Sequence, residues 1–199
     1  MPCYAFEGIV PAVDPTTFLH PTASVIGDVI IGPRCYIGPG ASLRGDFGRI
    51  LVEGDSSIQD NCTLHTGSGS DCIVRRGATI GHGAILHGCV VGVNALIGMN
   101  SVVLDGAEVG EDSLVAALSL VKNDAHFDPR SLIAGNPARF IRTLDPDTIK
   151  WRNDGDGEYQ RLADRSRAAL VECIPHSQPE DGRHRNVGRA RAVRLAKTT

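Results

Sequence analysis

The sequence predicts an all-β solenoid, a left-handed parallel β-helix built from hexapeptide repeats and followed by a C-terminal α-helix. Aliphatic residues recur every six positions, a small residue usually stands four positions later, and glycine often follows the aliphatic residue directly. Glycine is abundant, with 23 among 199 residues, whereas aromatic residues make up 5% of the chain. This composition favours tight turns and small-residue packing over a large aromatic core.

The repeat spans about residues 19–122 and contains three register breaks. In a β-helix of this kind each unit is one short strand and a turn. Three units form a triangular coil, and inward side chains of successive coils stack about 4.8 Å apart. An ordinary β-sandwich would instead require alternation with a period of two. The seventeen inward positions, just under six coils, are Leu19, Val25, Ile31, Ile37, Leu43, Val52, Ile58, Leu64, Val74, Ile80, Leu86, Val91, Ile97, Val103, Val109, Val115 and Val121.

The repeat divides the chain into four expected segments. We expect a lead-in strand or cap at 1–18 and the β-helix at 19–124. A connector with the C-terminal helix should occupy 125–173, and a basic tail without stable structure should follow at 174–199.

Loops and helix ends follow from local signals. Loops are expected to leave the coils at two register breaks, at residues 46–51 and 66–73. Asp145 is a candidate N-cap for a first helix, with Pro146 at its first position. A second helix is expected over about 158–173, where apolar residues recur at helical spacing.

Charge and cysteine usage limit the partners and the compartment. The formal net charge of −3 favours no polyanion partner for the body of the chain. A basic tail can bind nucleic acid or anionic lipid, but this one lacks interleaved aromatic residues, so we expect a solvated tail and no nucleic-acid partner. The six cysteines form no CxxC pair, which favours free thiols in the cytoplasm. No apolar run of about 18 residues exists, so we expect no membrane span.

Two histidines occupy the same position in successive coils. His65 directly follows inward Leu64, and His87 directly follows inward Leu86. The histidines are 22 residues apart, which is one coil of 18 plus the four-residue insertion. We therefore expect His65 and His87 to stack on one face of the β-helix.

His82 lies elsewhere in the repeat, two residues after inward Ile80 and near the preceding corner. A histidine there points away from the other pair and could join it only from an adjoining subunit. Three triangular prisms around a threefold axis would bring such faces together. The spacing therefore predicts a homotrimer in which His65 and His87 of one chain meet His82 of the next.

Three neutral imidazoles with an open fourth position are typical of a catalytic Zn²⁺ site, where the metal lowers the pKa of bound water. Fe²⁺, Co²⁺ or Ni²⁺ would accept the same ligands. Cys62 or Cys89 could close a structural site, but both fall in inward corner positions. The alternative is three unrelated surface histidines.

Four further polar residues lie near these histidines in the repeat. Gln59 and Asp60 follow an inward residue one coil before His82, where they could hold water or substrate. Arg44 occupies the His65 position one coil earlier, and it could pair with Asp46 to orient a metal ligand. Ion pairs of Arg44 with Asp46 or Asp60 that serve only structure are the alternative.

These residues resemble a known family. The repeats, RGDFGRI at Arg44–Ile50, IQDNC at Ile58–Cys62 and the histidines of IGHGAILHGC are similar to the γ-class carbonic anhydrases. The resemblance is closest to the branch of the phenylacetic acid degradation protein PaaY and its relative CaiE. It extends over about residues 4–170 and includes GMNSVVLDGA, GNPAR and EYQRL.

The resemblance implies a trimer with zinc between subunits and a helix packed on the coils. It implies an active site at Arg44, Asp46, Gln59, Asp60 and the three histidines, with Tyr159 close by. It also implies a thioesterase that hydrolyses ring-hydroxylated aryl acyl-CoA esters in phenylacetate catabolism.

Other functions remain open. Carbonic anhydrase activity, with CO2 and bicarbonate as substrates, is one alternative. Phe47 stands where the archetypal γ enzyme has a glutamate, and the loop after His65 is short, with only Asp71 as an acidic residue. We therefore expect weak or absent CO2 hydration. A metal-independent acyl- or acetyltransferase and a non-catalytic scaffold are further alternatives.

Overall fold

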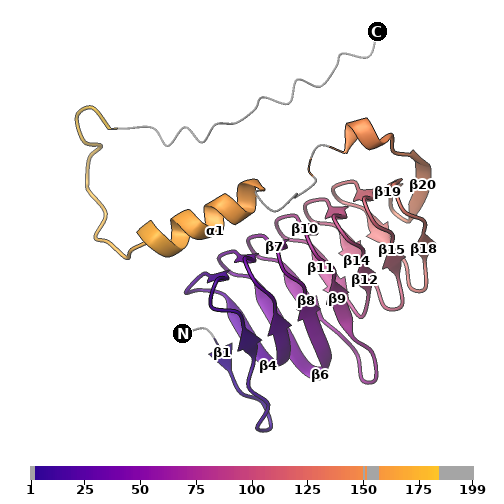
Figure 1. Cartoon of the computed structure of the whole chain (residues 1–199), viewed down its shortest axis with the longest axis horizontal. Helices are drawn as coiled ribbons and strands as arrows, with labels where there is room; N and C mark the ends of the chain where they lie inside the picture. Colours follow the sequence, from indigo (N-terminus) through magenta and orange to yellow (C-terminus); the bar gives the residue numbers. More distant parts are fainter. Residues whose placement is uncertain (1–2, 150, 152–156, 184–199) are drawn as a thin grey trace.

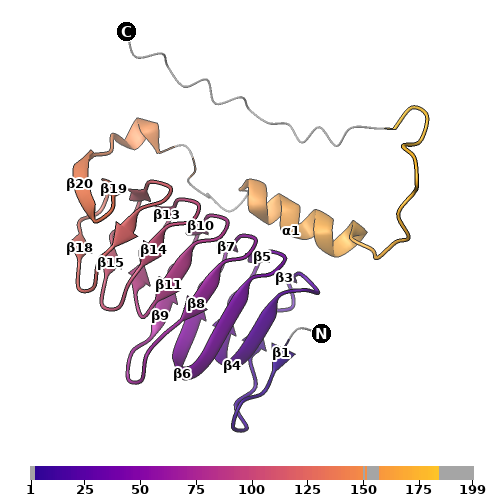
Figure 2. The same ribbon diagram turned by 180° about the vertical axis from the view of Figure 1, so that it is seen from behind.

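The structure, a computed structural model, describes residues 3–149, 151 and 157–183, and it is a parallel β-helix with one α-helix along its side (Figures 1 and 2). The third face contains seven parallel strands, so the helix has seven coils. The predicted fold class is confirmed. No helix in the described ranges is long and apolar enough to span a membrane.

Three faces of parallel strands form the triangular prism. The first face comprises β1 (Cys3–Tyr4), the first half of β4 (Ser24–Ile31), the first half of β6 (Ser42–Val52), β8 (Thr63–His65), β11 (Ile85–His87), β14 (Val102–Val103) and β17 (Leu120–Val121). The second comprises β2 (Ala12–Val13), the second halves of β4 and β6, β9 (Cys72–Val74), β12 (Val90–Val91), β15 (Glu108–Val109) and β18 (His126–Phe127). The third comprises β3 (Phe18–Leu19), β5 (Tyr36–Ile37), β7 (Ser57–Ile58), β10 (Thr79–Ile80), β13 (Leu96–Ile97), β16 (Leu114–Val115), β19 (Ser131–Gly135) and the antiparallel β20 (Ala138–Thr143).

The core consists of the inward aliphatic residues that the repeat identifies. All are buried except Leu19 in the first coil, which is partly buried. Leu43, Leu64 and Leu86 are direct register partners on three successive strands, so they form one continuous stack. The small residues fill the corners, where Cys62 and Cys89 are buried.

The coils extend further than the expected 19–124. β1, β2 and β3 already pair in parallel with the next coil, and β18 and β19 continue the pairing to Gly135. The C-terminal coil keeps the six-residue step, but its inward residue after Val121 is the aromatic Phe127. At the N-terminal end the step itself departs from the repeat, because Cys3 pairs with Val25, 22 residues later.

One of the two expected loops is absent. The prediction of a loop at 46–51 is wrong, because β6 continues through this corner. Gly45 and Ile50 pair with Gly27 and Val29, so four residues face the single Asp28 and the three extra residues bulge within the strand. The loop after His65 does leave the coils, and the Thr66 hydroxyl holds it through contacts to the Ser70 carbonyl and hydroxyl.

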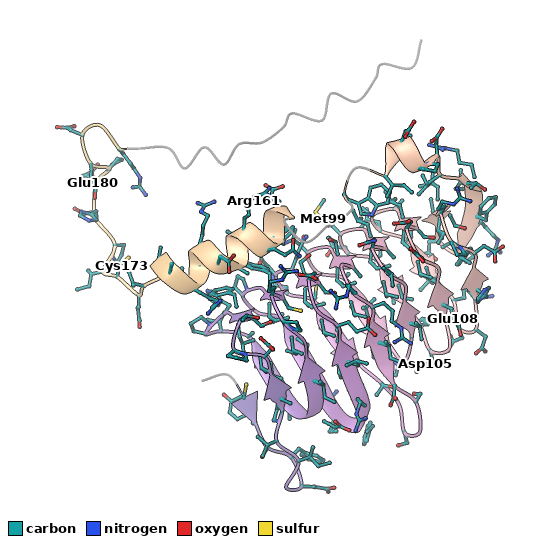
Figure 3. The ribbon with its side chains drawn as sticks, in the orientation of Figure 1. Met99, Asp105, Glu108, Arg161, Cys173 and Glu180 are labelled. Atoms are coloured by element: carbon teal, nitrogen blue, oxygen red, sulfur yellow. The ribbon has the colours of Figure 1, made fainter. Side chains whose placement is uncertain are left out.

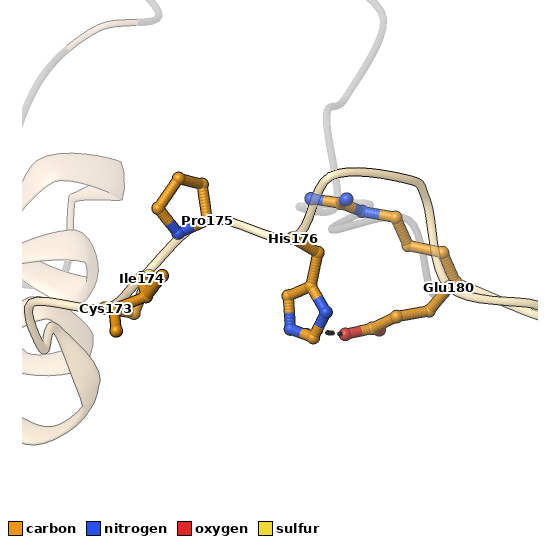
Figure 4. A pocket seen from close by; sticks show the side chains of 6 residues that line it. Cys173, Ile174, Pro175, His176 and Glu180 are labelled. Carbon is orange, nitrogen blue, oxygen red and sulfur yellow. Dashed lines mark ion pairs between the residues drawn. The ribbon is translucent and has the colours of Figure 1, made fainter.

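The C-terminal segment contains less helix than expected. Asp145 caps only the short 3-10 helix η1 (Pro146–Thr148), and α1 (Glu158–Ala169) ends before residue 173. Cys173 and the residues after it line a shallow hollow that this one segment forms by itself, with His176 Nε2 3.3 Å from Glu180 Oε1 (Figure 4). Most of the expected basic tail, residues 184–199, lies outside the described residues.

Contacts from α1 and Trp151 follow the corner between the second and third faces. Trp151 Nε1 donates to the Asn94 carbonyl, the Gln160 amide donates to the Asp55 carbonyl, and Arg167 donates to the Thr16 carbonyl. The Thr16 and Asp55 carbonyls are two coils apart, about 9.6 Å, and the Asp55 and Asn94 carbonyls are separated by the same distance. From Gln160 to Arg167 the helix rises about 10.5 Å. The helix therefore runs nearly along the solenoid axis.

The aliphatic stack predicts a specific stability loss. Leu64→Ala removes the middle member of the Leu43–Leu64–Leu86 stack, and we expect it to lower the free energy of unfolding by about 2–5 kcal/mol. Thr63→Ala, one residue earlier on the exposed side of the same strand, is the matched control. Denaturant unfolding measures both, and equal losses would contradict the stacked core.

Candidate metal centre

A continuous chain of polar contacts crosses the first face. Arg44 Nη1 lies 2.5 Å from Asp46 Oδ2, and Asp46 Oδ1 lies 2.9 Å from His65 Nε2. His65 Nδ1 lies 3.2 Å from His87 Nε2, and His87 Nδ1 lies 2.7 Å from Asp105 Oδ1. Five side chains from four successive coils thus meet in one line.

The strand register places the two histidines together. His65 ends β8, His87 ends β11, and the two are direct register partners. Arg44 directly follows Leu43, the partner of Leu64, and so occupies the same position one coil earlier. The structure therefore brings together Arg44, His65 and His87, as the repeat arithmetic predicts, and it adds Asp46, which the sequence offered as a partner of Arg44.

The donors and acceptors in this row of polar contacts fit a cation between the imidazoles of His65 and His87. Carboxylates only accept, so the ring nitrogens facing Asp46 and Asp105 carry hydrogens. Two neutral imidazoles supply two N–H groups, but three of these side-chain contacts involve a ring nitrogen. The remaining contact sets two nitrogen lone pairs against each other, an arrangement that a metal ion or an additional proton would stabilise.

The nitrogen separation also fits two ligands of one metal. Zn–N bonds of 2.0–2.1 Å at a tetrahedral angle place two ligand nitrogens about 3.3 Å apart, and His65 Nδ1 and His87 Nε2 are 3.2 Å apart. The carboxylates behind them match the second shell of metal-bound histidines, which fixes ring orientation. Burial acts to raise the pKa of Asp46, but hydrogen bonds from Arg44 and His65 outweigh it and leave that pKa below its ordinary value.

His82 lies apart from this pair. It occupies the corner between the third and first faces, where its Nδ1 lies 3.1 Å from Asp60 Oδ2 and its backbone N–H donates to Gln59 Oε1. Its side chain is 45% exposed. Within the described part of one chain, no three His, Cys, Asp or Glu residues converge on a common point. A single chain therefore provides two imidazoles at one place and a third at another.

Tyr159 lies on α1 over the third face. Its ring centroid is 5.3 Å from that of Tyr36, which in turn stacks on Phe18 at 5.5 Å. Burial, with smaller effects of Tyr36 and Asp60, raises the pKa of Tyr159 to about 12. Within the described residues, Tyr159 thus contacts Tyr36 and not the histidine pair.

Asp105 is the site residue that sequence reasoning missed. Asp105 lies in the turn after β14, at one edge of the coils (Figure 3). Its sequence context, an aspartate followed by glycine, is an ordinary turn signal, so nothing distinguished it from other turn aspartates. Phe47 is 60% exposed, and its ring centroid lies 5.7 Å from that of His65.

Comparisons with known proteins agree with the fold and the repeat. Over 188 residues the chain is 51% identical to the carnitine operon protein CaiE of Escherichia coli O157:H7, which covers 94% of this chain and 96% of that protein. CaiE of Shigella sonnei gives the same identity and coverage. This chain belongs to the CaiE family. No family model matches it.

Two solved structures resemble this CaiE family member. A hexapeptide transferase family protein from Anaplasma phagocytophilum has a TM-score of 0.74 at 38% identity and covers 84% of this chain and 98% of its own. The BC4754 gene product of Bacillus cereus, provisionally named an acetyltransferase, has the same TM-score at 32% identity and covers 82% and 91%. These relatives fit the left-handed winding of a hexapeptide-repeat β-helix.

The buried position of Tyr159 predicts an unusual titration. The difference in phenolate absorbance between the wild type and Tyr159→Phe should have its midpoint near pH 12, against about 10 for an ordinary tyrosine. Because the unfolded chain ionises first, Tyr159 should destabilise the fold as pH rises through this window. Tyr4→Phe, at an exposed position, is the control. A midpoint near the ordinary value would contradict the packing of α1.

Proposed function

We propose that three copies of the chain complete a divalent-metal site, with His65 and His87 from one copy and His82 from the next. The approach of His65 Nδ1 to His87 Nε2, each ring backed by a carboxylate, supports this most strongly. A zinc ion bound there would supply a Lewis acid and an activated water. His82 remains available because its described side-chain contact uses Nδ1 and leaves Nε2 for a ligand.

Exposed apolar residues along the His82 corner support the assembly. Met99 occupies the position of His82 one coil on, and Leu118 occupies the next position of this corner one coil later, as the backbone bonds from Asn100 to His82 and from Leu118 to Met99 show. Met99 is 53% exposed and Leu118 is 72% exposed. Leu118 also has a φ of +62°, which is rare for a bulky residue. A large apolar side chain held out in this way fits an interface better than a solvated turn.

The reaction we propose is hydrolysis of an acyl-CoA thioester, with ring-hydroxylated aryl acyl groups as the substrate class that the PaaY resemblance favours. Arg44 and Asp46 hold His65, while Gln59 and Asp60 flank His82 and are placed to orient water or the acyl carbonyl. Tyr159, whose pKa burial raises to about 12, is protonated at neutral pH, as an ordinary tyrosine is, so it could donate a hydrogen bond to substrate.

Two alternatives are weaker. Carbonic anhydrase activity needs a route for protons, and the exposed phenyl ring of Phe47 beside His65 neither accepts nor donates a proton. An acyl- or acetyltransferase agrees with the names of the similar structures. A transferase that uses a histidine base needs no metal, so metal content distinguishes it from the hydrolase.

Metal analysis and a thioester panel test the proposal. Purified protein should contain one divalent metal per chain and release thiol from aryl acyl-CoA esters. His65→Ala and His82→Ala should each lose both properties, whereas His126→Ala, at an exposed histidine on the second face, should keep them. Full thioesterase activity without metal would overturn the proposal.

Mixed assemblies test whether the site is shared between subunits. Co-assembly of His65→Ala chains with His82→Ala chains in equal amounts should restore about a quarter of the metal sites, because random mixing places intact complementary faces together at that frequency. Each variant alone should restore none. Sites confined to single chains would give no restoration on mixing, which would contradict the trimer.

A further inference from the structure

We propose that Asp105 is a positioning residue that holds the His87 ring as the Nδ1–H tautomer, opposite to the Nε2–H tautomer that Asp46 imposes on His65. The inference rests on the proposed metal site and deepens it. Asp105 orients the His87 ring so that Nε2 faces the metal position. Asp46 orients the His65 ring so that Nδ1 faces it, and the two histidines therefore bind through different ring nitrogens.

The contacts fix which nitrogen is available on each ring. Asp46 Oδ1 contacts His65 at Nε2, at 2.9 Å, whereas Asp105 Oδ1 contacts His87 at Nδ1, at 2.7 Å. Because an ionised carboxylate only accepts hydrogen bonds, each contacted nitrogen bears the ring hydrogen. The lone pairs left over are on His65 Nδ1 and His87 Nε2, the two nitrogens that face each other at 3.2 Å.

The repeat itself explains why opposite tautomers are needed. Side chains in the same position of successive coils are related by a translation of about 4.8 Å. Two imidazoles with the same rotamer and tautomer would direct the same nitrogen the same way and could not converge on one ion. Here the rings are tilted by 59° with centroids 5.2 Å apart. Asp46 approaches from the N-terminal side of the pair and Asp105 from the C-terminal side, so they break the translational equivalence.

The backbone around Asp105 is built to admit its carboxylate. Gly106 N–H donates to the Gly88 carbonyl, and the Asp105 carbonyl accepts from Asp124 N–H, which ties this turn to the coils on both sides. Gly88, directly after His87, has a φ of +53°, and a Cβ there would lie 2.5 Å from Asp105 Oδ1. A side chain at this position would collide with the Asp105 carboxylate in the place where it contacts His87.

A matched control lies one coil further on. Asp124 stands in the same relation to Gly106 as Asp105 does to Gly88, because a Cβ on Gly106 would meet Asp124 Oδ1. Asp124 is exposed, and within the described residues it contacts no histidine. Asp105→Ala and Asp124→Ala thus remove equivalent carboxylates from equivalent turns, and only the first removes the partner of His87.

The test reads the tautomers directly. Long-range ¹H–¹⁵N spectra of the metal-free, histidine-labelled full chain, recorded about two units above the ordinary histidine pKa of about 6.5, should show Nδ1–H for His87 and Nε2–H for His65. Asp105→Ala should convert His87 to mainly Nε2–H and weaken Zn²⁺ binding about 10–100-fold in competition with a chelator. Asp124→Ala should leave both the tautomers and the affinity unchanged.

The outcomes separate this inference from the proposed function. An Nε2–H tautomer for His87 in the wild type, or equal tautomers and Zn²⁺ affinities in the two variants, would overturn the role of Asp105 even if metal binds. The expected tautomers in a protein that binds no divalent metal would uphold the positioning role and reject the metal site. Thermal unfolding of both variants shows whether Asp105→Ala acts through the fold, since a positioning role requires similar midpoints.

Discussion

The strand spacing of about 4.8 Å between successive coils is the constraint on which the rest of the structure depends. Every inward aliphatic residue stacks on its register partner, and the buried Leu43–Leu64–Leu86 column is one such stack. The same spacing sets the distance between any two side chains that occupy one outward position. When two histidines stand at this distance, a tilt of the rings is enough to bring one nitrogen of each to the separation of two ligands in a tetrahedral metal site.

Insertions in this fold are absorbed at the corners and leave the faces in register. Three extra residues bulge within β6, and the loop after β8 accommodates the next insertion. Both insertions lie beside the histidine pair, and the first of them delivers Asp46 to His65. The regular faces therefore hold the two histidines in register, while the irregular corners bring the polar groups that contact them.

Counting residues along the six-residue repeat predicted the features of the structure that the repeat determines. The coils and the alignment of Arg44, His65 and His87 follow from counting residues, because parallel strands preserve register. The corners obey no such count. The continuous β6 at 46–51 and the approach of Asp105 to His87 depend on bulge and turn geometry, which the period does not specify. Tyr159 could be placed on a helix by its pattern, but its stacking on Tyr36 depends on how α1 docks.

The contacts of α1 with the solenoid depend on a match between the spacing of the coils and the rise of the helix. Two coils and about two helical turns cover nearly the same distance, so the Gln160 and Arg167 contacts repeat in step with the corner carbonyls. An ancestor that duplicated two coils could keep its brace by gaining seven residues of helix. A single duplicated coil adds about 4.8 Å, close to the rise of about 5.4 Å in one helical turn, so three or four further residues would keep the same face of the helix towards the corner. The solenoid and the helix that braces it can therefore lengthen together, by about one helical turn for each added coil.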